Sequence, residues 1–437
     1  MTGVQDGPAP AGGKREVPAP PPPPRWPLIA AIAVACAGTL LAGIGYAGSA
    51  RPGPPGSPEP PAQSRRRPPA ELDLTAVDAI LERRGRAVRA RDRAAFLASV
   101  DPAAHAAQAE LYADLATLPL AAWRQQADPA GPVATGPGDW TVRVTLRYRL
   151  RGFDRTDVVR TQYLTFAPRP GTGLAIVGDG AARGLRDDTE IWDGGRLSIV
   201  RGSRSLVIGN SAPRGRLRQI ADRLDQAVPT VTGVVGRRWD RRAVAVVPAT
   251  EEQTAALVGN GRSLQEIAAL ATVTPSAGGT PGNDRIVVSP AAYPKLNEIG
   301  RRVVLTHELT HVATQGAGDG RTPVWLIEGL ADYVGYQGVP VSVRSAAREL
   351  RRDVANGRTP RTLPDGPAFS GPAGRLSQAY QGAWLACRMV AERYGEDRLA
   401  RLYREAGTRP DALQRVLGVN TAEFTAMWRA YLRRELG

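Results

Sequence analysis

The stretch VVLTHELTHVAT, Val303 to Thr314, decides the fold of the second half of this chain. It contains two of the three histidines in 437 residues, four positions apart, with a glutamate directly after the first. Residues four apart on a helix lie on one face, with Cβ atoms about 5–6 Å apart. Apolar residues at Ile299, Val304 and Val312 predict that helix, and Gly316 is expected to end it.

The three residues His307, Glu308 and His311 form the pattern His-Glu-x-x-His. Two imidazoles on one helical face can both bind one Zn²⁺ at ~2.0–2.1 Å. Glu308, beside the first histidine, can act as the general base toward a zinc-activated water. A chance origin is disfavoured, because the expected count of this pattern in so histidine-poor a chain is on the order of one in a thousand. Catalytic zinc also needs a third protein ligand.

That third ligand is predicted seventeen residues further on, in the stretch PVWLIEGLADYVGY. Glu328 and Asp332 lie four apart on a second predicted helix, so Glu328 can complete a His₂Glu site. Asp332 can then hold the other ring nitrogen of a zinc-binding histidine. The alternative is a pair of solvent-facing acids. It fits poorly, because Glu328 stands among apolar residues and a buried carboxylate without a partner is costly.

The stretches HELTH (His307 to His311) and WLIEGLADY (Trp325 to Tyr333) resemble the gluzincin metallopeptidases of the peptidase MA-like group. The resemblance covers residues 190–437 and implies a zincin-like domain with one catalytic Zn²⁺. It implies His307, His311 and Glu328 as zinc ligands, Glu308 as general base and Asp332 as the support of a ligand. Tyr380, on a later predicted helix, is the candidate for stabilising the oxyanion. A tyrosine buried in the core is an equally good interpretation of that residue.

The chain around these motifs predicts an α+β fold in two regions. Residues 190–437, the second region, predict a hairpin turning near Gly202, a small mixed sheet and a helical half. Residues 72–185, the first region, predict helices over 76–100 and 103–126 and then antiparallel strands, beginning with the alternating WTVRVTLRYRLR at Trp140. This element order resembles the cone-like nuclear transport factor 2-like fold. His105 has no partner at ligand spacing and is expected at the surface or at a helix end.

The segment before these regions predicts a membrane anchor. Residues 26–48 carry no charge and are long enough for a single transmembrane helix. Residues 1–25 are expected to be a proline-rich cytoplasmic tail and residues 49–71 a Pro/Arg-rich linker. This predicts a single-pass protein of the cell membrane with an extracellular catalytic domain. A cleaved signal peptide and a lipoprotein modified at Cys36 are weaker alternatives.

The net charge of +15 does not predict nucleic-acid binding. Nearly all of the excess is arginine, since Lys14 and Lys295 are the only lysines, and it is spread along the chain. A nucleic-acid interface would gather its charge on one face, with aromatic residues interleaved. The predicted partners are therefore a peptide or protein substrate and, through residues 26–48, the membrane.

Together the patterns predict a membrane-anchored, zinc-dependent metallopeptidase. An inactive zincin-fold module that binds or scaffolds at the cell envelope is the alternative. The presence of Glu308 disfavours it, because a purely structural zinc site needs no base. In a third interpretation, the chain is an adaptor in which residues 72–184 carry the function.

Overall fold

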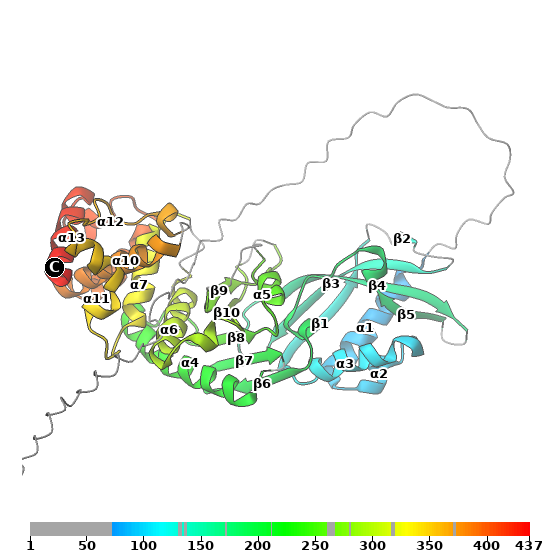
Figure 1. Cartoon of the computed structure of the whole chain (residues 1–437). Coiled ribbons are helices and arrows are strands. Elements are labelled where there is room, and N and C mark those ends of the chain that lie inside the picture. Colours follow the sequence, from blue (N-terminus) through cyan, green and yellow to red (C-terminus); the bar gives the residue numbers. More distant parts are fainter. Residues whose placement is uncertain are drawn as a thin grey trace, which may run out of the picture.

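The computed structural model describes residues 72–129, 133–134, 138–170, 173–210, 212–259, 267–278, 281–315, 320–369 and 373–437. The predicted tail, transmembrane segment and linker (1–25, 26–48 and 49–71) lie outside these residues, as does the predicted helix stop at Gly316. Within the described ranges, no helix has the length and apolar character needed to cross a bilayer. Figure 1 shows two sheets side by side and a helical end that contains the C-terminus.

The first region is a set of helices packed on an antiparallel sheet. Its helices are α1 (Leu74–Ala90), α2 (Arg93–Leu97) and α3 (His105–Leu115), with a short 3₁₀ turn at Pro102–Ala104. The strand order is β1-β3-β4-β5, with β2 beside β3; the strands are β1 (Leu120–Ala127), β2 (Val133–Ala134), β3 (Trp140–Leu150), β4 (Val158–Arg169) and β5 (Gly173–Asp179). The alternating stretch from Trp140 is β3, so that prediction is confirmed.

Two helix predictions in this region are wrong in part. The helix predicted over 76–100 breaks at Arg91, whose φ is +58°, and Asp92 then caps α2 by accepting a hydrogen bond from the Ala95 amide at 2.9 Å. The helix predicted over 103–126 ends at Leu115, and its last third is strand β1. Pro119 cannot continue a helix, and pairing with β3 buries Trp123 at 1% exposure.

The second region contains a five-stranded mixed sheet of order β6-β7-β8-β10-β9. Its strands are β6 (Leu197–Arg201), β7 (Ser205–Asn210), β8 (Ala243–Val247), β9 (Ala269–Val273) and β10 (Asp284–Val288). The predicted hairpin is β6–β7, which turns through Gly202 as expected. β7, β8 and β10 are parallel, whereas β9 is antiparallel to β10 and lies at the edge. Strand β9 was not predicted from the sequence.

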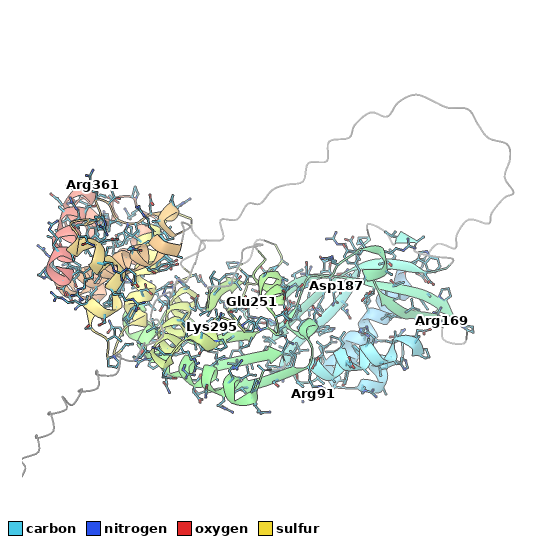
Figure 2. All side chains as sticks on the ribbon, viewed as in Figure 1. Arg91, Arg169, Asp187, Glu251, Lys295 and Arg361 are labelled. Carbon is cyan, nitrogen blue, oxygen red and sulfur yellow. The ribbon has the colours of Figure 1, made fainter. Side chains whose placement is uncertain are left out.

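Helices cover one face of this second sheet. α4 (Arg214–Val235) and α6 (Glu298–Thr314) share a core with Val207, Ala245 and Ile286. Figure 2 labels Lys295, which ends the 3₁₀ turn Tyr293–Lys295 ahead of α6, and Glu251, the first residue of α5 (Glu251–Val258). The remaining helices are α7 (Val324–Gly335), α8 (Val343–Ala346), α9 (Arg348–Ala355), α10 (Ala373–Tyr394), α11 (Glu396–Ala406), α12 (Ala412–Leu417) and α13 (Thr421–Leu436). The mixed sheet followed by helices confirms the α+β prediction for this region.

The other face of the second sheet packs against the first region. Leu206, Ile208 and Val246 belong to one buried cluster with Trp123 and Tyr148 of the first sheet. Burial of apolar surface of this kind contributes roughly 25 cal/mol per Å². The two regions therefore hold each other through a common core, as well as through the chain between them.

Candidate metal centre

Helix α6 places both histidines of the motif inside the protein. Asn297 caps its first turn, accepting a hydrogen bond from the Gly300 amide at 2.7 Å, and Gln315 ends it with a φ of +49°. The three polar side chains of the motif are buried: His307 and Glu308 are 0% exposed and His311 is 6% exposed. So much buried polarity in one turn requires partners from neighbouring elements.

Helix α7 supplies the carboxylate that faces the two rings. The Nε2 atoms of His307 and His311 lie 2.9 Å apart. Oε2 of Glu328 lies 3.3 Å from Nε2 of His307 and 3.6 Å from Nε2 of His311. The three side chains thus bring one possible ligand atom each within 4.8 Å of one another. The structure brings together the three residues that the sequence predicted as zinc ligands.

The arrangement fits a bound cation. Glu328 is 1% exposed, and neither of its carboxylate oxygens accepts a well-formed hydrogen bond from any residue that the structure describes. Two ring nitrogens that point at each other and at an unsatisfied buried carboxylate leave lone pairs that need a positive centre. Two imidazoles and one carboxylate are a ligand set that Zn²⁺ uses in catalytic sites.

Asp332, one turn after Glu328 on α7, contacts the ring nitrogen of His307 that faces away from the ligand cluster. Its Oδ1 lies 2.8 Å from Nδ1 of His307. Burial opposes a charged His307 ring, but the carboxylates of Asp332 and Glu328 raise its pKa well above the usual range. A carboxylate on Nδ1 fixes the ring orientation and leaves Nε2 directed at the site. Asp332 thus lies beside the His307 ring nitrogen that faces away from Glu328.

Glu308 contacts strand β9 of the second sheet. Its Oε2 accepts a hydrogen bond from the Ala271 amide of β9 at 2.7 Å. Complete burial raises the pKa of Glu308 above its usual value. The contact with the Ala271 amide could not be predicted from the sequence, because it is made by a backbone group on a strand that was not predicted. It joins the predicted base directly to the edge strand.

Tyr380 and His105 complete the account of the predicted residues. Tyr380 on α10 is 3% exposed, and its ring centroid lies 6.3 Å from that of His307 and 5.1 Å from that of Phe369. It therefore borders the site while belonging to the core. His105 lies in the first region, where its Nε2 is 2.9 Å from the Val100 carbonyl oxygen, and it takes no part in the cluster.

Comparison with known proteins yields zinc peptidases among solved structures. No family model and no curated protein matches the sequence. An M1 zinc metallopeptidase from Deinococcus radiodurans, bound to a Tyr-Ser-Ala substrate, aligns with 72% of this chain and 61% of its own at 12% identity and a TM-score of 0.32. Native yeast LTA4 hydrolase aligns with 69% of this chain and 65% of its own at 10% identity and a TM-score of 0.35.

A two-domain M1 zinc metallopeptidase bound to L-arginine is similar to the same degree, at 12% identity and a TM-score of 0.34, over 71% of this chain and 60% of its own. This chain thus spans less than two thirds of the length of each of these structures. At these TM-scores the likeness carries no conclusion about the activity of this chain. The functional conclusion rests on the side chains themselves.

Proposed function

We propose that this protein is a zinc-dependent metallopeptidase that hydrolyses peptide bonds. The observation that carries the proposal is the convergence of His307, His311 and Glu328 from two helices, with Glu308 in the same buried turn. In this proposal the first three residues hold one Zn²⁺. Asp332 keeps the His307 ring in place for that purpose.

The chain's own residues supply the proton transfers. When bound, Zn²⁺ supplies Lewis acidity, which polarises a carbonyl group and makes water more acidic. Glu308 takes a proton from the attacking water and later delivers it to the nitrogen of the leaving amine. Burial, which raises the pKa of Glu308, suits a group that must both accept and release a proton near neutral pH. Tyr380 donates a hydrogen bond to the oxyanion that develops at the scissile carbonyl.

The position of β9 supports a peptide as the substrate. This strand is the edge of the second sheet, and its Ala271 amide reaches Glu308. Val273 on the same strand is 57% exposed. An extended peptide can bind an edge strand by adding a further strand, with main-chain hydrogen bonds providing affinity. Such a peptide would run past Glu308.

Anchoring by residues 26–48 and an extracellular catalytic domain are part of the same proposal. They rest on the uncharged stretch and on the proline-rich segments on either side of it. Labelling the full chain in intact cells, with a membrane-impermeant reagent directed at a C-terminal tag, tests the orientation. Labelling only after the cells are broken would contradict it.

Metal content and cleavage of an unfolded protein test the peptidase proposal. The full chain is expected to bind one zinc and to cleave such a substrate. Glu308→Gln is expected to keep the zinc and to lose roughly 10²–10⁴-fold in kcat. Zinc without cleavage in either protein would instead support a binding or scaffold module. Absence of zinc would overturn the assignment of the ligands.

A further inference from the structure

We propose that the first region positions the base Glu308 by holding the β9–β10 hairpin in place. This inference rests on the proposed function, and it assigns a role to residues 72–185. Glu308 and the first region do not need to touch for this role. Strand β9, which donates a hydrogen bond to Glu308, connects them.

Asn283, at the foot of β10, is the first of two anchors. It is 2% exposed, and its Oδ1 accepts hydrogen bonds from the backbone amides of Arg155 at 2.8 Å and Thr156 at 3.2 Å. Its Nδ2 donates to the carbonyl oxygen of Thr156 at 2.9 Å. The buried Asn283 side chain therefore both accepts hydrogen bonds from, and donates one to, the backbone of the loop between β3 and β4.

Asn283 is also hydrogen-bonded to Thr274, on the other strand side of the hairpin. The Asn283 amide donates to Oγ1 of Thr274 at 3.0 Å, and the Thr274 amide donates to the Asn283 carbonyl oxygen at 2.9 Å. Thr274 directly follows β9. A shift of Asn283 would therefore move the end of the strand that carries Ala271.

Arg285, on β10, is the second anchor. Its guanidinium makes a two-pronged ion pair with Asp154 of the first region, with N–O distances of 2.8 and 2.9 Å. Both side chains are buried, at 7% and 0% exposure. In the β9–β10 register Arg285 pairs with Thr272, the residue next to Ala271. Paired Arg and carboxylate groups fix direction as well as distance.

These contacts lie at one edge of the second sheet only. β9 has β10 as its single partner among the described strands, whereas β10 also pairs with β8, so the position of β9 depends on β10 and on the contacts at the end of the hairpin. At the opposite edge, Oδ1 of Asp114 in α3 accepts a hydrogen bond from the Leu197 amide of β6 at 2.9 Å. Asp114 therefore also joins the first region to the second sheet, but far along the strand order from Glu308. It provides a matched control.

The test compares Asn283→Ala with Asp114→Ala in the full chain. We expect both to lower the melting temperature. Asn283→Ala is also expected to lower kcat about 10–100-fold, with KM and zinc content unchanged, because a small misplacement of a catalytic group is costly. Asp114→Ala, measured well below its melting temperature, should retain kcat. The isosteric Asn283→Asp keeps a side-chain oxygen that accepts from the Arg155 and Thr156 amides, loses the donor to the Thr156 carbonyl oxygen, and should fall in between.

Hydrogen exchange provides a readout that does not need activity. The amides of residues 269–273 should exchange roughly tenfold faster in Asn283→Ala than in the unchanged chain, and at the original rate in Asp114→Ala. Equal exchange in all three proteins, or an equal loss of kcat in both variants, would overturn the inference. An unchanged chain without peptidase activity would refute the proposed function, and the exchange of β9 would still decide whether the first region holds it.

Discussion

Nδ1 of His307 lies 2.8 Å from Oδ1 of Asp332, so a predicted zinc ligand is gripped by a residue one turn from another ligand, Glu328. Because a carboxylate in this position fixes the ligand ring and strengthens its basicity, Asp332→Asn should weaken zinc binding about 10–100-fold. Competition with a chromophoric chelator measures the change. Glu396→Gln, which alters the exposed acceptor of the Tyr333 hydroxyl, is the control and should bind zinc as before. Equal affinity in both variants would refute the role of Asp332.

Removal of the Tyr380 hydroxyl distinguishes an oxyanion donor from a core residue. If Tyr380 donates to the developing oxyanion, Tyr380→Phe should lower kcat roughly 10²–10³-fold with zinc affinity unchanged. Steady-state kinetics with one peptide substrate measures it. Tyr403→Phe, which removes a hydroxyl 3.2 Å from Oγ1 of Thr314 at the end of α6, is the control. Similar kcat values in the two variants would leave Tyr380 with a packing role alone.

Gly329 allows α7 to approach α10 closely. A Cβ at this position would lie 2.3 Å from the Ala383 carbonyl oxygen and 2.8 Å from Sγ of Cys387. Gly329→Ala should therefore cost about 1–3 kcal/mol in the free energy of unfolding, and it should weaken zinc binding by displacing the adjacent Glu328. Denaturant titration and zinc competition measure the two effects. Gly233→Ala in α4, where an added Cβ would have no atom within 4 Å beyond its own stretch of helix backbone, should be neutral or slightly stabilising.

Arg84 in α1 is a buried cation with no acidic partner in the described part of the chain. It is 2% exposed, stacks 3.6 Å from the Phe96 ring centroid and donates to Gln108, and burial lowers its pKa to about 9. The cost of burying its charge is fully present below that pH and is relieved as the pH rises through it. Arg84→Met should therefore raise the free energy of unfolding at pH 7, by roughly 1–4 kcal/mol. A lower free energy of unfolding in the variant would show that the contacts of Arg84 with Phe96 and Gln108 stabilise the fold by more than burial of its charge costs.

Zinc should stabilise the folded chain against heat. A ligand held by the native state alone adds about 2.7 kcal/mol when its free concentration is a hundred times its Kd. The metal-stripped chain should therefore melt at a lower temperature, and added zinc should restore it. Calorimetry of the unchanged chain and of Glu328→Ala measures the difference, and the variant should respond far less to zinc. An equal response would place the stabilising zinc elsewhere.

The ligand cluster could be predicted because its parts are local in sequence. His307 and His311 share a helical turn, and Glu328 and Asp332 share another, so helical periodicity sets each pair's spacing. The apolar residues around each pair then direct both turns into the core. Only the approach of α6 to α7 had to come from tertiary structure.

Strands β1 and β9 could not be predicted, because strand pairing overrides the preference of their own residues. Both are rich in alanine, which favours helix in isolation, and both become strands because they pair with another strand. β1 pairs with β3, and β9 pairs with β10. The amide that meets Glu308 depends on this strand pairing, and the anchor at Asn283 depends on contacts with Arg155 and Thr156, which are distant in the sequence. No residue pattern indicated them.

Because histidine is scarce in this chain, the NMR signals of its imidazole rings can report on metal binding directly. With three imidazoles in the chain, a nitrogen-detected NMR spectrum of the side chains should contain three ring systems. Nε2 of His105 faces the Val100 carbonyl oxygen in the first region, so its signals form an internal reference. The other two rings share one site and should move together as metal is titrated. Occupancy of the centre can therefore be followed atom by atom, without a substrate and without altering any residue.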